Sequence, residues 1–329
     1  MTHLRPLRSV IVVAGLGTFV GVVPVRGQQL DTASLISPNL AEQIVFAPSD
    51  DHVLNGGVLF TPQGPTAKPI AVVWIHGWGA NFYQPQYVLI GRALARRGVM
   101  TVVANTRMHD IANVQQYRDG QRIRGGGYWG IPSEQVRDIA AWIGLLEKRG
   151  VKRMVLVGHS AGWAAVRAYQ AERQDPRVAG LVLASGQVEP PAERPDQDLL
   201  KQADQFLKEG RGDDLVRIPN RSSPSFISAA TFRDDVATPP EIGDFFGVRI
   251  ASPAISRVSC PILAFFATRD DVGTEADLKR LHSAAERHSR RVQTTMIAGG
   301  DHMYSGEEEQ VSRVIFEWMD KVVAGESKK

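Results

Sequence analysis

The sequence contains very little cysteine: among its 329 residues there is one, Cys260. A single cysteine cannot form a disulfide within the chain, so a disulfide framework is excluded whatever the compartment. Cys260 stands directly before the apolar run Pro261–Phe266, which is typical of a buried strand. We therefore expect Cys260 to be a small core residue rather than a reactive thiol.

Long hydrophobic runs are also missing, except at the start of the chain. Arg5 and Arg8 precede an apolar stretch over residues 10–25, and small residues at 25 and 27 suit a cleavage site. Residues 1–27 are therefore predicted to be a secretory signal peptide, with the mature, secreted or periplasmic chain starting near Gln28. The alternative is an uncleaved N-terminal anchor, because the stretch is near the lower length limit for a spanning helix.

The chain also has no net excess of basic or acidic residues once residues 1–27 are left out. The full chain has 38 basic and 35 acidic residues, and residues 1–27 hold three arginines and no acidic residue, which leaves 35 of each. No Lys/Arg-rich run with interleaved aromatic residues remains, which argues against nucleic-acid binding. No GxGxxG opens a helix after an early strand, which argues against a dinucleotide-dependent dehydrogenase.

What the sequence does contain is an alternation of short Val/Ile/Leu-rich runs with amphipathic helical patterns. Residues 28–50 are polar and predict a loop, and the first convincing central strand covers 70–75. Further strands are expected at 100–105, 154–159, 180–185, 262–268 and 292–297, with a helix from about Ser133, its N-cap, to Lys148, and a last helix at about 306–323. This pattern predicts one α/β domain over residues 28–329, with a doubly wound, mostly parallel sheet covered on both faces.

One long segment, at about 187–258, interrupts this alternation between two core strands. It is too long for a plain connection, so it is expected to carry structure of its own. Its apolar residues Leu199, Ala203 and Leu207 fall on one helical face. We interpret it as a helical cap insertion over the carboxyl ends of the strands, the alternative being a peripheral subdomain that never touches substrate.

The strongest chemical signal is the run Met154–Gly162, an apolar strand that ends in Gly158-His159-Ser160-Ala161-Gly162 and leads into helix-forming sequence. A serine between glycines at a strand-to-helix reversal can occupy a sharp, strained turn with its hydroxyl exposed above the sheet. Ser160 is therefore the predicted nucleophile. Taken alone, GxSxG is equally consistent with a Gly-rich turn and a helix N-cap.

A serine nucleophile needs a base and an orienting acid, and both follow later strands. The strand at 262–268 runs into Asp270 and Asp271, and the strand at 292–297 runs into Asp301 and His302. The order Ser160, Asp270, His302 is the order of an α/β fold in which each residue lies after the carboxyl end of a strand. Asp271 is the alternative acid, and Asp301 is expected to be a turn or solvated residue.

An oxyanion formed by attack on a carbonyl needs donors that are already in place. One is expected to be the N–H of Ala161, directly after the nucleophile at a helix N-terminus. The other is expected in the loop His76-Gly77-Trp78-Gly79 after the first central strand, with the N–H of Trp78 as our choice. His76 is expected to order this loop, and His159 to pack or bond under the serine turn.

With these motifs in view, the chain resembles the α/β-hydrolase superfamily over nearly all of its mature length. The resemblance implies a serine after the fifth strand, an acid after the seventh and a histidine after the eighth. The segment Asn105–Asp110 is similar to an N-x-R-x-H-D segment found after the fourth strand in several serine hydrolases. Residues 125–139 and 228–246 resemble a branch that contains siderophore-ester and related carboxyl-ester hydrolases.

These observations together predict a serine hydrolase that cleaves a small-molecule carboxylic ester through an acyl-enzyme intermediate, with no metal or organic cofactor. A thioesterase, an aminopeptidase or a perhydrolase on the same fold, and a non-catalytic ligand-binding protein, are the alternatives. His109 and Asp110 are expected to form structural hydrogen bonds rather than a metal site. Arg107 and Arg124 are expected to be solvated surface residues, unless the substrate is acidic.

Overall fold

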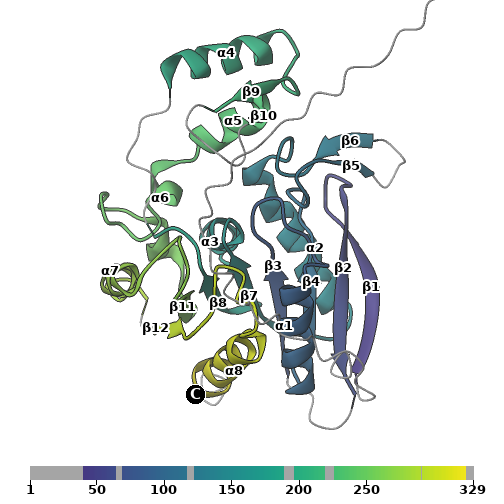
Figure 1. Cartoon of the computed structure of the whole chain (residues 1–329), viewed down its shortest axis with the longest axis vertical. Helices are drawn as coiled ribbons and strands as arrows, with labels where there is room; N and C mark the ends of the chain where they lie inside the picture. Colours follow the sequence, from purple (N-terminus) through teal and green to yellow (C-terminus); the bar gives the residue numbers. More distant parts are fainter. Residues whose placement is uncertain are drawn as a thin grey trace, which may run out of the picture. The chain divides into compact units, whose positions relative to one another are not determined.

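A computed structural model describes residues 40–63, 69–116, 122–188, 196–218, 226–289 and 291–323. All of them belong to one compact unit, Ser37–Lys329. At its centre lies an eight-stranded sheet in the order β1-β2-β4-β3-β7-β8-β11-β12 (Figure 1). Its strands are β1 (Leu40–Pro48), β2 (Leu54–Pro62), β3 (Ile70–Ile75), β4 (Thr101–Ala104), β7 (Arg153–His159), β8 (Val178–Ala184), β11 (Ile262–Ala267) and β12 (Val292–Ile297).

The sheet is mostly parallel, as the sequence predicts. Only the pairs β1–β2 and β2–β4 are antiparallel. The remaining neighbours, from β4 through β3, β7, β8 and β11 to β12, run parallel. The strands β3 and β12 begin and end at the predicted residues. Parallel neighbours place their carboxyl ends at one edge of the sheet, where the loops that hold the predicted site residues begin.

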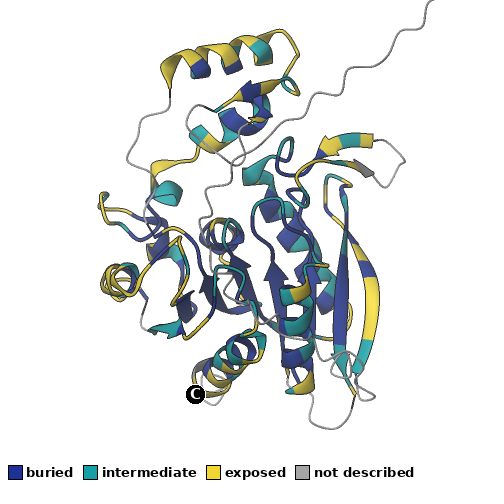
Figure 2. Cartoon of the chain, viewed as in Figure 1, coloured by how far each residue is buried: buried dark blue, intermediate teal, exposed yellow. Residues whose placement is uncertain are grey.

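Helices cover both faces of the sheet because its central strands are apolar on both sides. In β3, Ala71, Val73 and Ile75 pack in one buried cluster with α2 and α3, whereas Val72 and Trp74 pack in another with α1 and α8. Figure 2 shows the central strands buried between these layers. The helical segments around the sheet are α1 (Pro85–Arg96), η2 (Pro132–Glu134), α2 (Gln135–Glu147), α3 (Gly162–Arg173), α7 (Glu275–Ala285), α8 (Glu308–Trp318) and the π-helical η4 (Met319–Val323).

The segment between β8 and β11 has secondary structure and a small core of its own. Asp196 caps its first helix by accepting hydrogen bonds from two backbone N–H groups, and Leu199, Ala203 and Phe232 are buried in its core. Its elements are α4 (Gln197–Lys208), β9 (Leu215–Arg217), β10 (Phe226–Ser228), α5 (Ala229–Val236), α6 (Pro240–Gly243) and η3 (Ala254–Arg257). Figure 1 shows α4, β9, β10 and α5 gathered together beyond the end of the sheet.

Two local predictions are wrong. Residues 40–48, expected to be a loop, form the edge strand β1, in which Ile44 and Phe46 face solvent. Ser133 does not cap α2, because its N–H and hydroxyl both donate to the carboxylate of Asp234 in α5, at 2.8 and 2.6 Å. A hairpin that the sequence did not predict, β5 (Asn113–Gln116) with β6 (Arg122–Gly125), forms a separate two-stranded sheet.

The predicted signal peptide, residues 1–27, lies outside the described residues. Within the described ranges, no helix has both the length and the apolar character needed to cross a membrane. Cys260 is buried, with 8% of its surface exposed, so its prediction as a core residue is confirmed.

Candidate active site

Ser160 lies on a sharp turn between β7 and α3. Its φ of +53° lies in the left-handed region, which is strained for a residue with a side chain. The flanking glycines are required by close approach: a Cβ on Gly158 would lie 2.3 Å from the carbonyl oxygen of Gly162, and a Cβ on Gly162 would lie 2.6 Å from the carbonyl oxygens of Ile75 and His76. The sequence therefore forms the strained strand-to-helix turn that its GxSxG pattern predicts.

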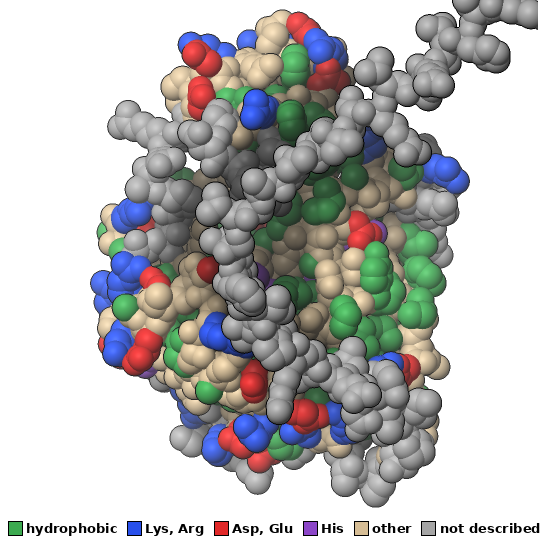
Figure 3. All heavy atoms as spheres, in the orientation of Figure 1, with side chains coloured by type: hydrophobic (Ala, Val, Ile, Leu, Met, Phe, Trp, Pro, Cys, Tyr) green, Lys and Arg blue, Asp and Glu red, His purple; other side chains and the backbone are tan. Residues whose placement is uncertain are grey.

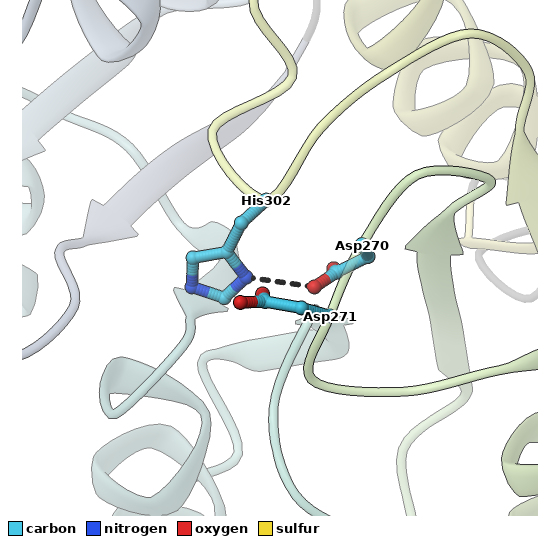
Figure 4. A group of neighbouring side chains, drawn as sticks. All are labelled: Asp270, Asp271 and His302. Atoms are coloured by element: carbon cyan, nitrogen blue, oxygen red, sulfur yellow. Dashed lines mark hydrogen bonds and ion pairs between the residues drawn. The ribbon is translucent and has the colours of Figure 1, made fainter.

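Asp270 and His302 are brought together from the ends of β11 and β12 (Figure 4). His302 Nδ1 lies 3.0 Å from Asp270 Oδ1, which also accepts the N–H of Val272 at 2.9 Å. The Asp270 side chain is fully buried, whereas Asp271 is exposed. Of the two neighbouring aspartates, Asp270 therefore makes the hydrogen bond that fixes the imidazole.

The Asp270 carboxylate and the His302 imidazole shift each other's pKa. Burial pushes the pKa of Asp270 upward, but the hydrogen bonds from His302 and Val272, together with the Ser185 hydroxyl, hold it below its usual value. Burial pushes the pKa of His302 downward, but the hydrogen bond and charge of Asp270 raise it above its usual value. The ionised carboxylate thus keeps the proton on Nδ1 of His302 and leaves Nε2 of the neutral ring as an acceptor.

His159 links the Ser160 turn to the loop of His302. Its Nε2–H donates to the backbone oxygen of His302 at 2.8 Å, and its Nδ1 accepts the hydroxyl of Tyr87 at 2.7 Å. The imidazole rings of His159 and His302 lie 4.8 Å apart between centroids. Burial lowers the pKa of His159 to about 3, so this ring stays neutral and holds the serine turn and the His302 loop together, as predicted.

The turn His76–Gly79 lies against the serine. A Cβ on Gly77 would lie 2.8 Å from the Cβ of Ser160 and 3.3 Å from its Oγ, so only glycine allows this approach. His76 orders the turn as predicted: its Nδ1–H donates to the oxygen of Gly77 at 2.7 Å, and its Nε2 accepts the N–H of Thr106 at 3.1 Å. On the other side of Ser160, Ala161 is the N-cap of α3, where backbone N–H groups have no acceptor within the helix.

The segment between β8 and β11 contacts this turn. Trp78 packs against the small apolar core formed by α4, β9, β10 and α5. The backbone N–H of Ser228 donates to the oxygen of Tyr128 at 2.7 Å, and Trp129 Nε1–H donates to the oxygen of Asp213 at 2.9 Å. Figure 3 shows hydrophobic side chains on the face where this segment meets the rest of the unit. An apolar surface therefore adjoins the turn that lies against Ser160.

A family comparison agrees with this geometry. The model of the alpha/beta hydrolase family matches residues 72–314, which run from within β3 to within α8. The chain belongs to the alpha/beta hydrolase family. In chain order, β7, β11 and β12 are the fifth, seventh and eighth strands of its main sheet, which are the positions that the family resemblance implies.

Solved structures share the fold of this α/β hydrolase at low sequence identity. A complex of DcsB with its substrate analogue has a TM-score of 0.64 and 15% identity, over 86% of this chain and 100% of the other. A thermostable carboxyl esterase from Bacillus coagulans has a TM-score of 0.61 and 14% identity, over 86% and 99%. Est1E from Butyrivibrio proteoclasticus has a TM-score of 0.59 and 16% identity, over 85% and 99%. A search of curated protein sequences finds no match.

His109 and Asp110 of this α/β hydrolase form structural hydrogen bonds, as predicted. The Asp110 carboxylate accepts from Asn81 Nδ2 at 2.7 Å and from the Tyr83 hydroxyl and His109 Nδ1 at 2.9 Å. Its backbone N–H donates to the oxygen of Ala80 at 2.9 Å. Hydrogen bonds of Asp110, in the segment after β4, therefore stabilise the loop that follows β3.

The prediction that Arg107 is a solvated surface residue is wrong. Its side chain is 4% exposed and donates to Asp138 at 3.0 and 3.1 Å and to Asp51 at 2.9 and 3.1 Å, with Glu134 as a further partner. Burial works against its charge, but Asp138 and Asp51 raise its pKa, so it stays charged. Arg107 ties α2 and the β1–β2 turn to the loop after β4. Arg124, in contrast, is exposed, and its guanidinium lies over the ring of Trp129.

Among the described residues, one group of three side chains has the spacing of a metal site: Asp270, Asp271 and His302, whose ligand atoms lie within 4.8 Å of one another (Figure 4). The hydrogen bond of His302 Nδ1 to Asp270 explains the closeness of two of them without an ion. The arrangement matches an acid that orients a histidine.

Sequence reasoning missed two residues next to this group. Ser185 directly follows β8, and Tyr304 stands two residues after His302; both are fully buried and both have positive φ. The only sequence signal for Ser185 is its position at the carboxyl end of a core strand, the kind of position that the other site residues share. Tyr304 has no local signal, because a tyrosine after a Gly-Gly-Asp-His turn is equally typical of core packing.

Proposed function

We propose that this α/β hydrolase is a serine hydrolase that cleaves carboxylic esters through an acyl-enzyme intermediate. The observation that carries the proposal is the 3.0 Å hydrogen bond between His302 Nδ1 and the buried Asp270, in a site whose serine has a strained φ of +53°. A serine hydroxyl becomes nucleophilic only when a base takes its proton, and an acid-bound imidazole is that base.

In the first half-reaction, Ser160 Oγ attacks the ester carbonyl carbon while His302 Nε2 takes the hydroxyl proton. Asp270 stabilises the imidazolium that forms and keeps the ring in the correct tautomer. The carbonyl oxygen becomes an oxyanion and accepts hydrogen bonds from the N–H groups of Trp78 and Ala161. When the tetrahedral intermediate collapses, His302 returns the proton to the leaving alcohol and the acyl group stays on Ser160.

In the second half-reaction, His302 takes a proton from water, and the hydroxide equivalent attacks the acyl-enzyme carbonyl. The same donors hold the second oxyanion, and collapse releases the carboxylic acid and regenerates Ser160. Every step uses side chains and backbone groups of this chain. The apolar contacts of Trp78 with the α4–α5 segment support a substrate with an apolar acyl or alcohol group, and they support a role of that segment as a cap.

The test is hydrolysis of short p-nitrophenyl esters by the wild type and by Ser160→Ala, with Ser312→Ala as the matched control. Ser312 is a buried serine in α8, where its hydroxyl donates to the backbone oxygen of Glu309. We expect Ser160→Ala to lose turnover and Ser312→Ala to keep it. Wild-type turnover of thioesters or amides in preference to esters would reassign the substrate class. Wild type without turnover on any of the three would favour a ligand-binding protein.

We also propose that residues 1–27 direct export and are then removed. The apolar stretch after Arg5 and Arg8 supports this, since it has the layout of a signal peptide. Intact-mass measurement of the protein from the periplasmic or extracellular fraction should give a chain that starts near Gln28. A full-length chain in the membrane fraction would identify an uncleaved anchor instead.

A further inference from the structure

Strand β8 holds no member of the proposed triad, yet it lies between β7, which leads to Ser160, and β11, which leads to Asp270. Its end contacts both neighbours. The N–H of Ser160 donates to the oxygen of Ala184, and the N–H of Ser185 donates to the oxygen of Phe265, each at 2.9 Å. The end of β8 thus fixes the relative position of the two strands from which the serine and the acid emerge.

Ser185 is held in an unfavourable conformation at this point. It is fully buried, and its φ of +51° lies in the left-handed region, which is unfavourable for a residue other than glycine. Asn, Asp or Gly would adopt this conformation more readily. Strained residues of this kind persist when the surrounding structure fixes them, and they are concentrated at functional sites.

The Ser185 hydroxyl lies between Tyr304 and the acid. The hydroxyl of Tyr304 donates to Ser185 Oγ at 2.6 Å. Tyr304 stays protonated, because burial raises its pKa well above the usual value, so it is the donor in this bond. The hydrogen of Ser185 is therefore available for another acceptor, and the Asp270 carboxylate, whose pKa the Ser185 hydroxyl helps to lower, is the acceptor that we infer.

One oxygen of the Asp270 carboxylate is available as an acceptor for the Ser185 hydroxyl. Oδ1 is occupied by His302 and Val272, whereas the buried Oδ2 has no hydrogen bond of standard geometry within the described residues. A buried carboxylate oxygen without a donor is unfavourable. The Ser185 hydroxyl is the group that can supply this donor.

Tyr304 is itself fixed from several sides. It is fully buried with a φ of +61°, and its ring packs edge-on against His159 at 5.4 Å and Phe265 at 5.6 Å between centroids. His159 in turn bonds the backbone of His302. The phenol is therefore a rigid donor that belongs to the same loop as the base.

We propose that Ser185 and Tyr304 are positioning residues that hold the Asp270 carboxylate in the orientation in which it bonds His302. The proposal rests on the proposed serine-hydrolase function. Without this pair, the carboxylate can rotate away from Nδ1, and the imidazole loses part of its fixed orientation. The expected loss is in the chemical step and not in substrate binding, because neither residue is proposed to touch the substrate.

A positioning role also predicts a change in the protonation of the base. His302 faces Asp270, Asp271 and Asp301, which all raise its pKa, and the neutral ring of His159. If the Asp270 carboxylate turns away, the largest favourable interaction of the imidazolium weakens. The pKa of His302 should then fall toward its usual value of 6.5.

The experiment compares Ser185→Ala, Ser185→Gly and Tyr304→Phe with the wild type on a p-nitrophenyl ester, across pH. We expect kcat to fall about tenfold, the effect of losing a hydrogen bond to a charged group, with KM little changed. The acid limb of the kcat/KM profile should move to lower pH. Tyr169→Phe is the matched control, since this buried tyrosine donates to Asp175 at 2.7 Å in another part of the fold and its loss should leave the pH profile unchanged.

The glycine variant separates the hydroxyl from the strain. Ser185→Gly removes both, whereas Ser185→Ala removes the hydroxyl and keeps the strain. Equal losses of kcat in these two variants would support the proposal, and recovery of kcat in Ser185→Gly would overturn it. An unchanged pH profile in all three variants, with only a lower Tm, would also overturn it. Wild type that lacks ester turnover would refute the proposed function instead, which keeps the two failures distinct.

Discussion

Replacing Asp270 by asparagine would keep the size of the side chain but remove the charge that faces His302. The structure gives Asp270 Oδ1 two donors, His302 Nδ1 at 3.0 Å and the N–H of Val272 at 2.9 Å. An amide can present its NH₂ to the imidazole and thereby stabilise the wrong tautomer, with the proton on Nε2. In a serine triad, this change lowers kcat by about 10⁴-fold.

Asp271→Asn is the matched comparison, because it makes the same change one residue away. The Asp271 carboxylate is exposed and lies within 4.8 Å of the site atoms of Asp270 and His302. At this distance in water, a unit charge contributes about 0.9 kcal/mol, which corresponds to a rate change of about fivefold at most and less at physiological salt.

The two variants should therefore differ by about three orders of magnitude. The assay is kcat/KM for p-nitrophenyl acetate at a pH where His302 is neutral, with Tm measured for each variant to confirm folding. A loss in Asp271→Asn equal to or larger than that in Asp270→Asn would refute the reasoning. It would make Asp271 the orienting acid in the active enzyme.

Three further perturbations test other parts of the account. Because Asp270 raises the pKa of His302 and the base must be neutral, kcat/KM should rise with pH through an inflection above 6.5, and an inflection below that value would contradict the ion pair. Gly158→Ala should lower the free energy of unfolding, measured by urea titration, by about 3 kcal/mol, because the new Cβ would lie 2.3 Å from a backbone oxygen. Gly144→Ala, whose Cβ would have nothing within 4 Å, should raise it by about 0.5–1 kcal/mol, and equal effects of the two variants would show that the turn relaxes easily. Arg167→Met should leave the free energy of unfolding equal or higher, because Nε and Nη1 of this buried guanidinium have no hydrogen-bond partner in the described part of the chain and burial lowers its pKa to about 9. A loss of more than about 2 kcal/mol would mean that the contacts of Arg167 with the rings of Trp163, Phe245 and Phe246 outweigh its desolvation.

The strands that could be predicted from the sequence stand out by a run of apolar or β-branched residues. The buried strand β3 and the partly exposed edge strand β12 both begin and end where such a run does. The other edge strand, β1, was missed. In β1, Ile44 and Phe46 face solvent while Val45 is buried, so the apolar residues follow no single face, and β-structure there depends on pairing with β2.

Long-range polar contacts explain the local errors. The sequence cannot show that Asp51 and Asp138, 56 and 31 residues from Arg107, surround its guanidinium and make burial possible. Nor can it show that Asp234, 101 residues away, accepts both donors of Ser133 and removes it from the end of α2. Local propensity favours a cap at Ser133, but tertiary hydrogen bonding decides its partner.

The three proposed catalytic residues could be predicted from the sequence, whereas the residues that hold them in position could not. Ser160, Asp270 and His302 each follow a recognisable strand in a turn with a distinct pattern, and parallel topology places all three turns at one edge of the sheet. The contacts that hold them involve ordinary residues: the hydroxyl of Tyr87 on His159, and that of Tyr304 on Ser185. Only the three-dimensional arrangement distinguishes these tyrosines from other buried aromatic residues.

The central claim is that Ser160 is the nucleophile, and the most direct measurement is the site of covalent modification by a fluorophosphonate. The wild-type protein should gain one adduct in its intact mass, and peptide mapping should locate it on Ser160, with no adduct on Ser160→Ala. An adduct on another residue, labelling that persists in Ser160→Ala, or no labelling of folded wild type would contradict the account.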